Sequence, residues 1–209
     1  FHELLEDDDA FAQAVAEIPG SKKEGVWQNF FEANPWILGL SLNGQLLTSW
    51  DDEKLEKIVA GRTVAGVGKR ADALLATSGR IRSMVFAEFK THQTPLLSTE
   101  YRDGCWAPST HVSGGVSQAQ GTIHRASTAI GERLALLDKD GAERLGEFGY
   151  LLRPKSYLVV GRLDEFVGAS GGHHVDKVRS FELYRRQLVD PEIATFDELL
   201  ARADWLVAS

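Results

Sequence analysis

The sequence predicts a single α/β domain. Segments in which apolar residues recur at helical spacing alternate with short apolar runs that are typical of buried strands. The chain has 209 residues, of which 43% are hydrophobic and 25% charged, and this is enough for one sizeable core. It shows no internal repeat, low-complexity tract or linker that would divide it.

The first part of the chain predicts two helices and a strand. The first helix is amphipathic and ends at Pro19-Gly20, because proline cannot continue a helix. Ser21 can cap the second helix, with Glu24 three residues on at the capping-box position. The elements expected before residue 61 are a helix over 3–18, a helix from 21 to about 34, a strand over 44–50 and a charged helical or loop segment over 51–60.

The rest of the chain predicts a hairpin followed by helices and strands. Two apolar arms flank Ser78-Gly79-Arg80, which is typical of a β-hairpin turn. Val116, Ala119 and Ile123 recur at helical spacing. The elements expected are hairpin arms at about 70–76 and 82–90, a polar loop over 91–114, a helix over 116–137, a strand over 155–161, a helix over 174–189 and, within 191–207, a short strand, a capped turn and a final helix.

Negative charge is concentrated at the start of the chain. The formal net charge is −7, and residues 1–10 supply −5 of it, because they hold five acidic residues and no Lys or Arg. We therefore expect an acidic N-terminal helix or leader over 1–20 and a nearly balanced domain over 21–209. That balance is compatible with a local basic groove for nucleic acid.

The sequence also indicates the cellular compartment of the protein. No apolar run approaches the roughly 18 residues of a membrane span, and the start lacks the basic and apolar regions of a secretion signal. Cys105 is the single cysteine, which excludes an internal disulfide and fits the reducing cytoplasm. The chain opens with Phe1 and its only methionine is Met84, so we expect it to be the C-terminal part of a longer protein.

Two charged residues stand at the end of an apolar strand, in the stretch MVFAEFKT. Glu88 and Lys90 are two residues apart, so they lie on one face of the strand. Asp72 lies in the facing arm of the hairpin. A turn centred on Arg80 places residue 72 opposite residue 88, and a turn centred on Gly79 places it one step diagonal from residue 88. Both registers leave the three side chains on one face.

These residue types support metal-dependent hydrolysis of a phosphodiester. Two carboxylates on facing strands, about 5 Å apart at their β-carbons, can share a divalent cation. Oxygen ligands suit Mg²⁺, for which Mn²⁺ can substitute. The cation would polarise a phosphodiester oxygen and acidify a bound water, while Lys90 would orient that water, stabilise charge or accept the proton. The alternative is an ordinary strand whose charged end emerges into solvent, because an isolated E-x-K tripeptide is common.

The pattern of Asp72 followed by Glu88-x-Lys90 on the next strand resembles the PD-(D/E)xK nuclease superfamily, with Ala71 in the place of the proline. The chain as a whole is similar to the nuclease domain of the Shedu anti-phage defence proteins. The stretches that carry this resemblance span roughly residues 22–207 and are EGVWQNFFEANPWIL, RADALLA, FAEFKT, YRDGCWAPST, VSQAQGTIHR, SYLVVGR and PEIATFDELLARADWLV.

The resemblance implies a restriction-endonuclease-like core, in which a mixed central β-sheet is flanked by helices. It implies that Asp72 and Glu88 bind the metal together with the Phe89 carbonyl, and that Lys90 is catalytic. It also implies DNA as the substrate and a homo-oligomer, either a dimer or a tetramer.

Helix residues complete the site that the resemblance implies. Gln120 is the expected catalytic glutamine. His124, one turn further on, stands where relatives often carry Tyr and is assigned to DNA binding. In such folds a Glu on the first core helix often approaches the metal. Glu24 is our choice for this role, with Glu32 as the rival.

Other polar residues are candidates for DNA contacts. Lys69 and Arg70 lie beside the hairpin, in the stretch TVAGVGKR, which lacks the first Gly and the final Ser or Thr of a phosphate-binding P-loop. His92 follows the second hairpin arm and could touch the scissile phosphate. Tyr101, Arg102 and Trp106, in the long polar loop, could stack on bases, bind phosphate or take part in an oligomer contact.

Two further groups of residues are better explained as ordinary surface residues than as functional sites. His173-His174 follow two glycines, but zinc sites need more ligands at defined spacing. Arg179, Arg185 and Arg186 make the helix over 174–189 basic, but the nearby Glu182 favours an ordinary charged helix face over a DNA groove.

Taken together, the sequence predicts a Mg²⁺-dependent DNA endonuclease of a bacterial defence system. One alternative is a domain of the same fold that binds nucleic acid or a partner without cutting. The other is a domain whose apolar helices mainly oligomerise a longer protein.

Overall fold

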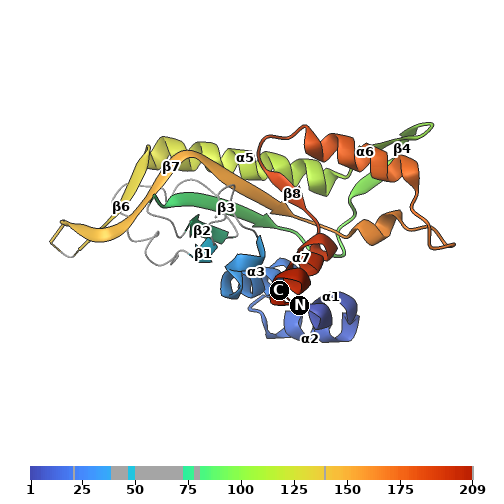
Figure 1. The fold of residues 1–209 in the computed structure, drawn as a ribbon, viewed down its shortest axis with the longest axis horizontal. Coiled ribbons are helices and arrows are strands. Elements are labelled where there is room, and N and C mark those ends of the chain that lie inside the picture. Colours follow the sequence, from blue (N-terminus) through green and yellow to red (C-terminus); the bar gives the residue numbers. More distant parts are fainter. Residues whose placement is uncertain (21, 39–46, 50–72, 78–80, 139, 209) are drawn as a thin grey trace.

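The computed structural model describes residues 1–20, 22–38, 47–49, 73–77, 81–138 and 140–208. Within them a mixed β-sheet lies between helices (Figure 1). The strands follow the order β1 (Leu47–Ser49), β2 (Ala73–Thr77), β3 (Ser83–Phe89), β7 (Glu143–Val159) and β6 (Arg133–Leu137), and β8 (Glu192–Ala194) pairs with the C-terminal end of β7.

The sheet combines parallel and antiparallel pairs. β3 runs parallel to β7, and β7 runs parallel to β8. The pairs β1–β2, β2–β3 and β6–β7 are antiparallel, and short connections join β2 to β3 and β6 to β7. This arrangement confirms the predicted α/β fold with a mixed central sheet flanked by helices.

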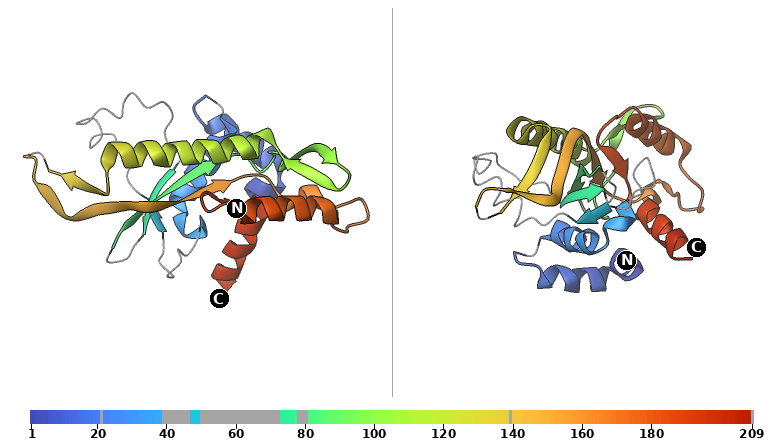
Figure 2. Two further views of the ribbon diagram at one scale, coloured as in Figure 1. Left: turned by 90° about the horizontal axis from the view of Figure 1, so that it is seen from above. Right: turned by 60° about the vertical axis from the view of Figure 1, so that its left-hand side comes forward.

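Helices cover both faces of the sheet (Figures 1 and 2). The long helix α5 (Thr110–Ile130) packs on one face, and α3 (Lys23–Ala33) and α7 (Phe196–Ala208) pack on the other. The remaining elements are α1 (His2–Glu6), α2 (Asp8–Glu17), the short 3₁₀ turns η1 (Pro35–Leu38) and η2 (Leu163–Phe166), the two-stranded sheet β4 (Leu97–Arg102) and β5 (Cys105–Pro108), and α6 (Val175–Arg186). Among the described helices, none is both long and apolar enough to cross a membrane.

The alternation of side chains along β3 divides the core into two layers. Val85, Ala87 and Phe89 join the cluster that contains α3 and α7 side chains, and the Phe89 ring stacks on Phe31. Met84 and Phe86 point to the opposite face and belong to the cluster beneath α5. By this alternation Glu88 and Lys90 fall on the α5 face.

The acidic start of the chain forms two helices rather than one. Asp7 ends α1 and caps α2, because its side chain accepts hydrogen bonds from the amides of Asp9 and Ala10 at 2.9 and 3.1 Å. The apolar side of these helices joins the core of α3 and α7 through Leu5 and Phe11, which are 3% and 2% exposed.

Two segments differ from the predicted elements. The helix expected over 116–137 begins earlier, because Ser109 caps it by accepting from the Val112 amide at 3.1 Å, and it ends at Gly131, whose φ is 79°. Residues 133–137 are strand β6 instead, paired with the N-terminal half of β7. The loop expected over 91–114 contains the β4–β5 hairpin.

Candidate functional site

The end of β3 brings together a carboxylate, an ammonium and a helix amide. Lys90 Nζ donates to Glu88 Oε1 at 2.6 Å and to Gln118 Oε1 of α5 at 3.4 Å. The side chains of Glu88 and Lys90 are only 4% and 19% exposed. Because little water reaches this ion pair, its charges interact more strongly than an exposed pair does.

The parallel pairing with β7 fixes the position of this group. Glu88 pairs with Leu158, and the Lys90 amide donates to the Val159 carbonyl at 2.9 Å. A small cavity of about 10 Å³ lies beside Glu88, and its lining is mostly apolar, from Phe86, Ala87 and Ala119 together with Thr122 and Tyr157. Glu88 and Lys90 therefore form a polar group at the edge of an apolar space between the sheet and α5.

The hairpin register agrees with one of the two predicted registers. Ala73 pairs with Ala87, and Ala76 pairs with Met84, so the pairs are symmetrical about residue 80. Asp72, Lys69 and Arg70 lie outside the described residues, and their predicted roles stay predictions.

The described part of the chain holds two oxygen donors that could bind a metal ion. Among these residues no group of three or more His, Cys, Asp and Glu side chains is placed to hold one. The chemistry of the donors present, the Glu88 carboxylate and the neighbouring Phe89 carbonyl, nevertheless suits a hard cation such as Mg²⁺. Glu88 already holds one positive charge, the Lys90 ammonium, in a nearly buried position.

The acidic residues of α3 lie apart from Glu88. Glu24 is exposed in the first turn of α3, whose buried side chains pack on the Phe89 side of the sheet. Glu32 is half-buried and accepts from Gln28 Nε2 at 2.9 Å. The structure brings neither carboxylate into the group around Lys90.

The helix glutamine at Lys90 is Gln118, not the expected Gln120. Gln120 is exposed and donates to the Asp190 carbonyl at 2.9 Å, and His124 is exposed further along α5. Residues two apart on a helix point about 200° apart, so only one of the two glutamines can face the sheet. Gly115 packs on the sheet, and residues three apart on a helix share a face. The position of Gln118, three residues after Gly115, therefore indicates that it faces the sheet.

His92 lies in the interior, although we had predicted a phosphate contact. It is 6% exposed, and its Nδ1 accepts from Trp27 Nε1 at 3.1 Å. The Phe11 ring packs edge-on against it with 4.6 Å between centroids. Burial, helped by the positive charge of Arg162, lowers the pKa of His92 from 6.5 to about 4, so the ring is neutral at neutral pH.

The β4–β5 hairpin presents Tyr101 and Arg102 at the surface, whereas its Trp106 is half-buried. Tyr101 is 74% exposed, and the Arg102 guanidinium lies over its ring at 5.5 Å. The indole of Trp106 is covered by Lys177 at 4.6 Å and packs against His174. Arg102 is thus accessible, but the structure does not bring it to the group around Lys90.

The basic residues of α6 have acidic partners. Both oxygens of Glu198 accept from Arg185 at 2.7 Å, and Glu182 binds Arg185 and also Arg186. Burial alone lowers the pKa of Arg185, but its hydrogen bonds to Glu198 and Glu182 raise it above the ordinary value. This network favours the charged-face interpretation of α6.

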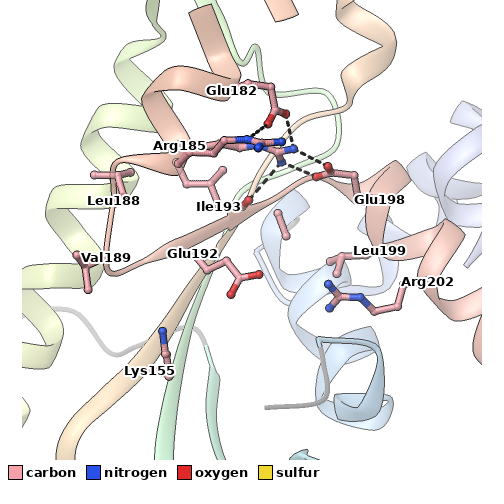
Figure 3. Close-up of a pocket in the computed structure, with 12 residues that line it drawn as sticks. Lys155, Glu182, Arg185, Leu188, Val189, Glu192, Ile193, Glu198, Leu199 and Arg202 are labelled. Carbon is pink, nitrogen blue, oxygen red and sulfur yellow. Dashed lines mark hydrogen bonds and ion pairs between the residues drawn. The ribbon is translucent and has the colours of Figure 1, made fainter. Parts of the chain in front are cut away.

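A larger cavity lies away from Glu88. It has a volume of about 470 Å³ and opens where α6, α7 and β8 meet (Figure 3). Arg185 and its carboxylate partners lie on one side, and Glu192, Lys155 and Arg202 lie around the rest. This mixture of charges shows no preference for phosphate.

Comparison with known proteins identifies relatives. The family model described as Shedu protein SduA, C-terminal, matches residues 21–200. The curated Shedu protein SduA of Bacillus cereus (strain B4264) is 28% identical over 187 residues, a match that covers 88% of this chain and 45% of that protein. The chain therefore spans less than half the length of this relative.

Proposed function

Because the chain belongs to the Shedu family, we propose that it is a metal-dependent DNA endonuclease of a bacterial anti-phage defence system. The observation that supports this most is the nearly buried Glu88 carboxylate in contact with the Lys90 ammonium, next to Gln118. An ordinary strand end would present these charges to solvent, so the alternative of a solvated E-x-K is disfavoured. We further propose a cytoplasmic homo-oligomer, a dimer or tetramer, which light scattering tests directly.

The residues that would hold the cation are Glu88, the carbonyl of Phe89 and, from the sequence pattern, Asp72. Glu24 stays a weaker proposal, because it is exposed on a helix that packs on the other face of the sheet. The cation is Mg²⁺, with Mn²⁺ as a substitute, and it supplies a polarised phosphate oxygen and an acidified water when bound.

Lys90 stabilises the negative charge that develops on the phosphate during cleavage. With 19% of its side chain exposed, its charge is screened less than that of a surface lysine. Gln118 accepts a hydrogen bond from the ammonium and limits the directions it can take. Lys69, Arg70, Arg102 and His124 are proposed DNA contacts.

The test is cleavage of supercoiled and linear DNA in Mg²⁺, Mn²⁺ and EDTA. We expect metal-dependent cutting that falls by about a hundredfold or more in Asp72→Ala, Glu88→Gln and Lys90→Met. The matched controls are Glu192→Gln and Lys155→Met, which remove the same charges from an exposed and a half-buried position in the same sheet. Gln118→Ala should lower cutting more than Gln120→Ala.

Retained cutting in two of the three site variants would reject the assignment. Metal-independent DNA binding without nicking would instead favour the alternative of a binding domain. Cutting of linear DNA alone would indicate that the domain recognises ends.

A further inference from the structure

The Lys90 ammonium is bound to the carboxylate that would hold the proposed metal. Lys90 Nζ lies 2.6 Å from Glu88 Oε1, with both side chains largely buried. If Glu88 held Mg²⁺, the same carboxylate would carry a divalent ion and an ammonium. Two cations on one carboxylate would repel strongly where water is scarce.

Gln118 offers this ammonium a second position. Its Oε1 lies 3.4 Å from Lys90 Nζ, a long hydrogen bond compared with the short contact to Glu88. The ammonium carries three donors, so it can move toward the amide oxygen and keep a hydrogen bond. The amide is neutral and binds the ammonium whether or not Glu88 is engaged elsewhere.

We propose that the Lys90 ammonium competes with the divalent cation for Glu88, and that Gln118 is the positioning residue that holds the ammonium once the cation is bound. This inference rests on the proposed function and deepens it. Without metal the pair neutralises a buried carboxylate, and with metal Lys90 moves to its working position. The site therefore becomes ready for catalysis only when the cation binds.

The competition predicts opposite effects on metal affinity. Lys90→Met removes the competing charge and raises the affinity for Mn²⁺ about tenfold, because a hydrogen-bonded ion pair is worth about that factor. Lys90→Gln keeps a polar side chain and serves as a second variant if the methionine disturbs folding. Gln118→Leu leaves the ammonium on Glu88 and lowers the affinity by about threefold or more.

The experiment is calorimetric titration of the DNA-free protein with Mn²⁺, after circular dichroism has shown that each variant is folded. Glu88→Gln defines the binding that belongs to this site. Lys155→Met and Ser117→Ala are the matched controls, because Lys155 is a half-buried lysine of β7 whose ion-pair partner is Asp190, and Ser117 is exposed next to Gln118 on α5. Neither control should change the affinity.

Unchanged affinity in both Lys90 variants would overturn the competition. Gln118→Leu with the same affinity as Ser117→Ala would overturn the role of Gln118. Wild-type binding no tighter than that of Glu88→Gln would remove Glu88 as a ligand and the competition with it. The cleavage assay is separate: metal-dependent cutting with unchanged affinity in the Lys90 variants leaves the proposed function standing and rejects only this inference.

Discussion

Protonation of His92 is expected to destabilise the fold in mild acid. The ring is buried, and its Nδ1 accepts a hydrogen bond from Trp27 Nε1 at 3.1 Å. A proton on Nδ1 would place two N–H donors face to face and leave a charge among aromatic rings. The pKa of His92 is accordingly lowered to about 4, whereas an unfolded chain binds this proton below about 6.5.

The sign and size of the effect follow from linkage. Between about pH 6.5 and pH 4 the unfolded state binds more protons, so the free energy of unfolding falls as the pH falls. From pH 7 to pH 5 the loss that His92 causes is about 2 kcal/mol. It adds to the losses from other titrating groups, so a variant without this group is needed as the reference.

His92→Asn supplies that reference, because its amide oxygen can accept from Trp27 and does not titrate in this range. Urea denaturation of both proteins at pH 7 and pH 5 should show the wild type losing about 2 kcal/mol more than the variant. Parallel behaviour of the two proteins, or an NMR titration of His92 with a midpoint near 6.5, would refute the reasoning.

Two predictions concern the packing around the sheet. A Cβ on Gly115 would lie 2.8 Å from Leu158 Cδ1, whereas one on Gly114 meets nothing within 4 Å. Urea denaturation should therefore show Gly115→Ala destabilised by about 1 kcal/mol and Gly114→Ala stabilised by about 0.5–1 kcal/mol; equal effects would contradict the close approach of α5. Glu198→Ala should lower the free energy of unfolding by about 2 kcal/mol, because the variant loses both 2.7 Å hydrogen bonds from Arg185 and those from the Thr195 amide and hydroxyl. A change below about 0.5 kcal/mol would show that this pair is surface-like.

The sequence predicted the elements that depend on local pattern. The apolar run and turn residues gave the β2–β3 hairpin, and helical spacing indicated α5, α6 and α7. Strand β6 was missed, because residues 133–137 continue the apolar pattern of a helix and become a strand only by pairing with β7. That pairing is a tertiary effect that local propensity does not contain.

The candidate site was also predictable only where it depends on local spacing. The two-residue spacing of Glu88 and Lys90 correctly placed both on one face, since Lys90 Nζ contacts Glu88. The same alternation did not predict the position of His92, because strand β3 ends at Phe89. The chain then turns, and the Thr94 amide donates a hydrogen bond to the Thr91 carbonyl. Whether Gln118 or Gln120 faces Lys90 depends on the rotation of α5 about its axis. The close packing of Gly115 on the sheet sets that rotation.

The parallel pairing of β3 with β7 also has a consequence for the order of folding. Each of these strands has a near partner in sequence, β2 for one and β6 for the other, so two hairpins can form early and independently. The pairing of Glu88 with Leu158 instead closes a long loop, which is slow because much chain entropy is lost before the contact forms. The strand end that carries Glu88 and Lys90 is therefore completed late, and a partly folded or nascent chain has its hairpins before it has the proposed site.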